Sequence, residues 1–130
     1  MEALHGPQLD QALATALGLA WEECCTLEAG YTLWIKDSAG RIVMQDSAGV
    51  AEHPATDATE AFRLAMWLVK ERGWTIVSTL DSKDAFVECY LPDGGEGSTV
   101  SKDTAEAICL SILEAAQKEP GGGGFKKHGR

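Results

Sequence analysis

Apolar residues recur at intervals of three and four in three stretches of the chain, which predicts three amphipathic helices. The first runs from about residue 8 to 19, the second from about 58 to 71, and the third from about 104 to 118. Asp57 and Asp103 precede the second and third helices, where each can accept hydrogen bonds from the free amides of the first turn. The core face predicted for the second helix consists of Phe62, Ala65, Met66 and Val69, with Ala61 and Leu68 at its margin.

Between the helices, short stretches rich in aromatic and β-branched residues predict two β-hairpins. Turn-forming residues, Asp-Ser-Ala-Gly in the first hairpin and Asp-Ser-Lys-Asp in the second, separate the two strands of each. The remaining segments are expected to be connections, including a Gly-rich loop after Pro92. The predicted strands are residues 31–36, 41–45, 74–80 and 85–91, and the predicted connections are residues 21–29, 46–56 and 92–101.

The two halves of the chain repeat each other in order. Residues 30–33 (Gly-Tyr-Thr-Leu) recur as residues 73–76 (Gly-Trp-Thr-Ile), and the Asp-x-x-Glu helix start also occurs twice. Each half is therefore predicted to be a ββα unit, which gives the order α-ββα-ββα in an α+β protein. Two hairpins side by side predict a four-stranded, mainly antiparallel sheet. Because the first and third strands carry apolar residues on both faces, we expect helices on both sides, in a three-layer αβα sandwich.

The chain has 130 residues, of which 45% are hydrophobic and 24% charged, as in a folded protein. We expect one α+β domain over residues 1–119 and a flexible, Gly-rich basic tail over residues 120–130. The formal net charge is −9, so sequence-independent nucleic-acid binding is not expected. With neither a secretory signal nor an apolar run of about 20 residues, the chain is expected to be cytoplasmic and not membrane-bound.

Three stretches resemble the phage ABA sandwich domain family, which comprises small proteins of tailed bacteriophages. They are residues 9–18 (Leu-Asp-Gln-Ala-Leu-Ala-Thr-Ala-Leu-Gly), 56–62 (Thr-Asp-Ala-Thr-Glu-Ala-Phe) and 104–110 (Thr-Ala-Glu-Ala-Ile-Cys-Leu). Ala105 stands where that family often has proline. The resemblance implies a helix–sheet–helix sandwich, a phage or prophage origin and hence the host cytoplasm. It implies no catalytic residues, because the family is known as one of uncharacterised function.

No motif for nucleophilic, phosphate-transfer or metal-dependent catalysis occurs in the chain. The cysteines at positions 24, 25, 89 and 109 form no Cys-x-x-Cys pair, and Cys89 and Cys109 are expected to be small buried apolar residues. We therefore predict a protein that is not an enzyme and that holds no metal or cofactor. A hydrolase using dispersed carboxylates, such as Glu22, Glu23 and Glu28, ranks last among the alternatives.

The residues most able to bind a ligand are an aromatic residue on a two-faced strand and nearby cationic or titratable side chains. They are Trp34, Lys36, Arg41, His53 and Arg63. An aromatic ring with cations suits a small nucleotide-like ligand held between the subunits of a homo-oligomer. We therefore predict a non-enzymatic phage accessory protein that counters host defence by sequestering a nucleotide-like immune signal. The alternative is a protein–protein interaction or structural module that engages a host protein through an acidic surface.

Overall fold

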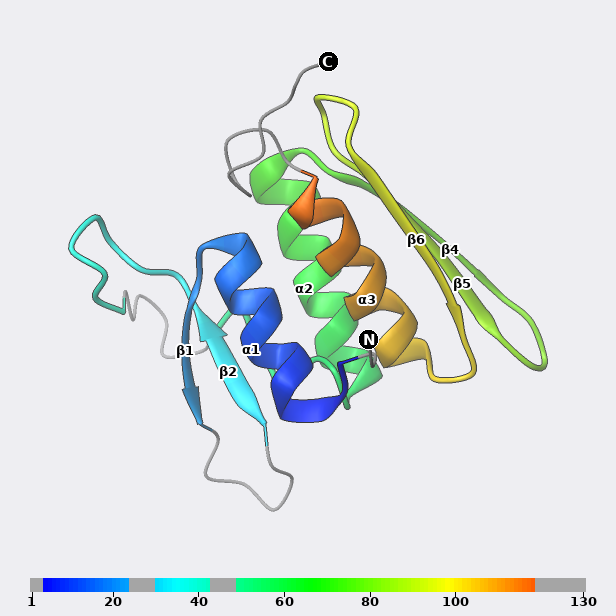
Figure 1. Cartoon of the computed structure of the whole chain (residues 1–130), viewed down its shortest axis with the longest axis horizontal. Coiled ribbons are helices and arrows are strands. Elements are labelled where there is room, and N and C mark those ends of the chain that lie inside the picture. Colours follow the sequence, from blue (N-terminus) through cyan, green and yellow to red (C-terminus); the bar gives the residue numbers. More distant parts are fainter. Residues whose placement is uncertain (1–3, 24–29, 43–48, 119–130) are drawn as a thin grey trace.

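The computed structural model describes residues 4–23, 30–42 and 49–118, in which two antiparallel sheets flank a layer of three helices (Figure 1). The elements in chain order are α1 (Gly6–Leu17), β1 (Ala20–Glu23), β2 (Tyr31–Trp34), β3 (Ala51–Glu52), α2 (Ala58–Arg72), β4 (Thr75–Leu80), β5 (Ala85–Tyr90), β6 (Glu96–Ser101) and α3 (Thr104–Gln117). None of these helices has both the length and the apolar character needed to cross a membrane.

Each sheet is a three-stranded antiparallel meander. The first has the order β1-β2-β3, in which Leu33 of the central strand lies between Trp21 of β1 and Ala51 of β3. The second has the order β4-β5-β6, with Cys89 between Ile76 and Gly97. The chain is therefore α+β, as predicted, and it contains two βββα units.

The predicted single four-stranded sheet in an αβα sandwich is wrong, because three segments expected as loops contain strands. Residues 20–23 form β1, residues 51–52 form β3 and residues 96–101 form β6. The first sheet therefore pairs β2 with β1 and β3, and the second adds β6 to the predicted hairpin of β4 and β5. The three additional strands hold few large apolar residues, so no alternating pattern marks them in the sequence. Of the return strand predicted at 41–45, Ile42 pairs with Lys36 in an isolated bridge, and residues 43–45 lie outside the described ranges.

The predicted helix caps are confirmed. Asp57 accepts hydrogen bonds from the amides of Thr59 (2.9 Å) and Glu60 (3.3 Å), and Asp103 accepts one from Glu106 (3.2 Å). The two glutamates contact neighbouring strands. Glu60 accepts from the backbone amide of Glu52, next to α2, and Glu106 accepts from the hydroxyl of Ser101 at the end of β6. Each helix start is thereby fixed to the strand that precedes it.

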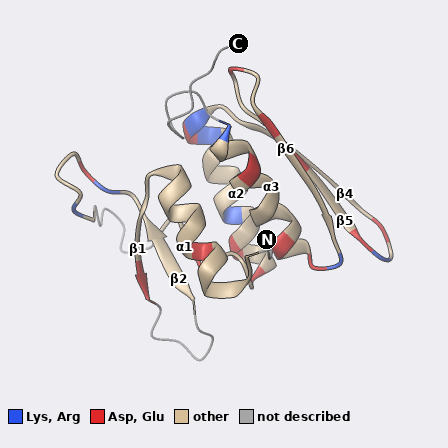
Figure 2. Ribbon diagram, viewed as in Figure 1, with Lys and Arg blue, Asp and Glu red and all other residues tan. Residues whose placement is uncertain are grey.

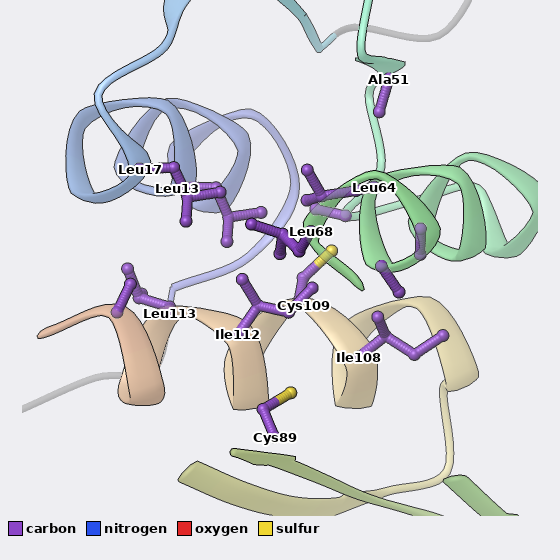
Figure 3. Packing of buried hydrophobic residues seen from close by; sticks show 14 of the residues in the cluster. Leu13, Leu17, Ala51, Leu64, Leu68, Cys89, Ile108, Cys109, Ile112 and Leu113 are labelled. Atoms are coloured by element: carbon purple, nitrogen blue, oxygen red, sulfur yellow. The ribbon is translucent and has the colours of Figure 1, made fainter. Parts of the chain in front are cut away.

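The core lies where the three helices meet, as Figure 3 shows. It is made of residues at helical spacing, including Leu13, Leu17, Leu64, Leu68, Ile108 and Ile112. The predicted core face of α2 is partly wrong. Ala65 is buried, but 41% of Phe62 and 51% of Met66 are exposed, and the buried set is Ala61, Leu64, Ala65 and Leu68. The helical period was correct, and the inward face is rotated by one residue, or about 100°.

Candidate functional site

A groove of about 570 Å³ lies between α1 and α3, with β1 at its side. Its lining combines small apolar side chains, neutral amides and one indole. The lining residues are Leu4, Gln8, Gln11, Ala12, Thr15, Ala16, Trp21, Leu113, Ala116 and Gln117. The volume lies in the range of about 300–1,000 Å³ that is typical of small-molecule sites.

The spacing of residues along α1 explains how the sequence builds this groove. Leu9, Leu13 and Leu17 turn one face of the helix into the core, and the adjacent face carries residues of the groove. On that adjacent face, Ala12 and Ala16 are too small to fill the space beside α3. Polar side chains follow the rim of the helix at positions 8, 11 and 15, one turn apart. Small residues below and polar residues at the rim leave a hollow that is open to solvent.

The chemistry of the groove is neutral. Its amides can both donate and accept hydrogen bonds, and Trp21 offers an exposed indole ring for stacking. The hydroxyl of Thr15 donates to the backbone carbonyl of Gln11 at 3.1 Å and keeps its lone pairs available as acceptors. None of the lining side chains is charged. The groove therefore suits an uncharged molecule with a flat apolar part and several hydrogen-bonding groups.

The residues predicted as ligand contacts from the sequence lie elsewhere and do not form one site. Lys36 and Arg41 lie on the loop after β2, where the Nε atom of Arg41 is 3.3 Å from Oδ2 of Asp37. Hydrogen bonds from backbone amides, chiefly that of Arg41, lower the pKa of Asp37 and keep this turn carboxylate ionised. Figure 2 shows the basic residues in separate places, on this loop, on α2, at the turn after β4 and at the turn between β6 and α3.

Two of the predicted residues, Trp34 and Arg63, do meet, at Gly49. Arg63 donates to the carbonyl of Gly49 at 2.8 Å and to Oε1 of Glu60 at 2.7 Å. A Cβ atom on Gly49 would lie 3.5 Å from Cδ2 of the Trp34 ring. Only 8% of Trp34 is exposed, and its buried Nε1 has no hydrogen-bond partner among the described residues. Trp34 is therefore a packing residue at this point, and the charge of Arg63 is already paired.

His53 is buried in the turn between β3 and α2, next to a carboxylate, Asp10, that is not among the predicted site residues. Asp10 of α1 is fully buried and accepts hydrogen bonds from the amides of Ala55 (2.8 Å) and Tyr31 (3.3 Å). Burial raises the pKa of Asp10, and the two backbone bonds and the nearby His53 partly oppose that rise. His53 has a positive φ of 33°, and its Nδ1 lies 3.3 Å from the hydroxyl of Thr56. Since Asp10 is sealed from solvent, this cluster fixes the fold and offers no binding surface.

The sequence did contain a sign of this role for Asp10. Asp10 lies on the same face of α1 as Leu13, Ala14 and Leu17, at spacings of three, four and seven residues. A single carboxylate on an otherwise apolar stripe is seldom buried unless it has partners. Its partners here are backbone amides from distant segments, which no pattern of side chains reveals.

The cysteines that the structure describes, Cys89 and Cys109, are buried free thiols, as predicted for small core residues. Burial raises the pKa of Cys89 to about 12 and that of Cys109 well above its usual value. Neither thiol is therefore a nucleophile near neutral pH. The described ranges contain no group of three or more histidine, cysteine and carboxylate side chains placed to hold a metal ion.

Comparisons with protein-family models, with curated proteins and with solved structures found no match to this chain. The resemblance to the phage ABA sandwich family, and the phage origin that it implies, stay predictions from the sequence.

Proposed function

We propose that this protein is a non-enzymatic binding protein that holds an uncharged small molecule in the groove between α1 and α3. The observation that carries the proposal is the composition of the lining: an exposed indole and three neutral amides around a hollow floored by small apolar side chains. Sites of this kind bind through apolar burial and orient the ligand with a few polar groups. Sequestration of a host signal requires only such binding and no catalytic residue.

The neutral lining is the reason to favour an uncharged ligand over an anionic nucleotide. Phosphate groups are normally held by arginine or lysine side chains or by the amides at a helix N-terminus. The groove has no cationic side chain, and Arg41 and Arg63 are paired with acidic residues outside it.

A nucleotide-like ligand is the second candidate. It is favoured by the meeting of Arg63 and Trp34 at Gly49, but it would have to displace Glu60 from Arg63.

Titration calorimetry with two panels of compounds tests these candidates. One panel contains uncharged aromatic amides and nucleobases, and the other contains mono- and dinucleotides. We expect binding from the first panel, and we expect Thr15→Trp to weaken it at least tenfold because the new side chain fills the groove. Thr59→Trp is the matched control, since Thr59 is also an exposed helix residue but lies outside the groove.

The outcome also separates the two candidate sites. Nucleotide binding that survives Thr15→Trp but is lost in Arg63→Ala would move the site to Gly49 and overturn the groove proposal. The groove proposal would also be overturned if neither panel binds, or if Thr15→Trp and Thr59→Trp weaken ligand binding equally.

A further inference from the structure

The second sheet has two edge strands, and only one of them is protected within the described residues. β6 is covered by α3: the amide of Ser98 donates to Oε1 of Glu114 at 2.8 Å. A Cβ atom on Gly97 would lie 2.6 Å from the backbone of Ser111 and Ala115, so strand and helix are in close contact. This edge is therefore closed to further strands.

β4, at the other edge, lacks each of these protections. Its sequence, Thr-Ile-Val-Ser-Thr-Leu, contains no charged residue, no proline and no glycine. In the described part of the chain, no side chain hydrogen-bonds to the backbone of β4. Edge strands of native proteins usually carry a lysine, a proline or a bulge, or are covered, because an open edge pairs with other strands. Within the described residues, the edge of β4 is therefore open to pairing with another strand, unlike that of β6.

Apolar side chains are also exposed on both faces of β4. Val77 is 44% exposed on the outward face of the sheet, and Leu80 is 57% exposed on the other face. An added strand would cover part of both. Burial of such side chains stabilises an edge pairing beyond its backbone hydrogen bonds.

We propose that the partner is a second copy of this chain and that two β4 strands pair antiparallel about a two-fold axis at Ser78. Residues on the same face of the sheet then meet: Ile76 lies opposite the second copy's Leu80, and Val77 opposite the second copy's Thr79. The two second sheets join into one continuous sheet.

The absence of charged side chains on β4 makes this edge a place where a second copy can bind. Each chain carries a net charge of −9, so two copies associate only where the contact itself is uncharged. β4 provides six uncharged residues in a row, and in the Ser78 register Asp81 faces the second copy's Thr75, so no two carboxylates meet. A basic partner would instead be drawn to acidic side chains, which β4 lacks. Since a strand-to-strand contact buries little area, we expect a dimer with a micromolar dissociation constant.

Sedimentation equilibrium over a range of protein concentrations tests the proposal with two matched variants. Leu80 and Val100 are similarly exposed, at 57% and 60%, but lie on opposite edges of the same sheet. We expect Leu80→Lys to weaken the dimer at least tenfold and Val100→Lys to leave it unchanged. A native chain that stays monomeric at 200 µM overturns the proposal, as does equal weakening by both variants. Far-UV circular dichroism verifies that both variants fold.

A cysteine at the axis tests the register. Facing residues in an antiparallel pair have Cα atoms about 4.5–5.5 Å apart, within the range of a disulfide. We expect Ser78→Cys to form an intermolecular disulfide on mild oxidation, and peptide mapping should locate it between the two copies of residue 78. A disulfide formed only by Val77→Cys would overturn the Ser78 register. This contact is separate from the groove, so the test of the dimer does not depend on whether the groove binds a ligand.

Discussion

At the scale of single residues, the buried carboxylate of Asp10 connects three parts of the chain. It lies on α1 and accepts hydrogen bonds from Tyr31 at the start of β2 and from Ala55 before α2. Gly30 is required beside it, because a Cβ atom there would clash with the side chain of His53 and lie 3.0 Å from Oδ2 of Asp10. Two backbone donors thus depend on one buried acceptor, which stabilises the fold at the cost of burying a titratable group.

The raised pKa of Asp10 predicts a specific pH dependence of stability. The folded state binds the Asp10 proton more tightly than the unfolded state does, so this residue stabilises the fold most below pH 3.8. Its contribution falls as the pH rises from 3.8 through the raised pKa of the folded state. Asp10→Asn removes this titration. The free energy of unfolding of this variant should therefore rise relative to that of the native chain as the pH increases through that window. Urea unfolding at intervals from pH 3.5 to 7 measures the difference.

Asp37 is the control for this prediction because its pKa is shifted the other way. Backbone hydrogen bonds lower the pKa of Asp37, so its contribution is present above pH 3.8 and is lost as the pH falls. Asp37→Asn should therefore become less stable than the native chain with rising pH, in the opposite sense to Asp10→Asn. If both variants follow the same trend, the pH dependence does not come from the burial of Asp10.

At the scale of the elements, the contact between β6 and α3 depends on the absence of a side chain at Gly97. Gly97→Ala would place a methyl group 2.6 Å from the backbone of α3, which is tighter than any packed contact tolerates. We expect a loss of about 1–3 kcal/mol in the free energy of unfolding, because strand and helix must separate. Urea unfolding monitored by tryptophan fluorescence measures this loss.

Gly95, in the turn before β6, is the matched control. A Cβ atom there would be at least 3.5 Å from its neighbours, and its φ is not positive. Gly95→Ala should be neutral or stabilise the protein by up to about 1 kcal/mol, since alanine restricts the unfolded chain. Equal destabilisation by both substitutions would contradict this prediction. It would show that the loss of stability comes from the turn and not from the packing of β6 on α3.

The sequence predicted the local features of these elements better than their assembly. Helix periods and the caps Asp57 and Asp103 depend on residues within one or two turns, so they are visible in the sequence. The sequence does not reveal β6, because one of its inward residues is Gly97. The lack of a side chain at this position lets the strand lie close to α3, so no apolar side chain marks the inward face there. The groove was missed for a related reason, since glutamines beside alanines look like a solvated helix face. The packing between elements decides which residues come together in one site. The spacing of residues along the sequence does not reveal that packing.

At the scale of the whole molecule, the helical layer lies between two sheets whose other faces point away from it (Figure 1). Acidic residues are spread over strands, helices and turns (Figure 2), and the net charge of −9 makes two copies of the chain repel each other. The uncharged edge of β4 is therefore opposed by the charge of the rest of the molecule. The strength of self-association should depend on how far that repulsion extends.

Salt should therefore strengthen the β4 dimer. Raising the ionic strength from about 0.01 M to about 0.1 M shortens the Debye length from about 30 Å to about 10 Å, which screens the repulsion between the two acidic molecules. The uncharged contact itself is not weakened by this screening, so we expect the dissociation constant to fall several-fold. Sedimentation equilibrium at pH 7 at both ionic strengths measures the change, and Leu80→Lys should remain monomeric at each. A dimer that weakens with added salt would mean that charge pairs hold it together, which the uncharged edge of β4 cannot provide.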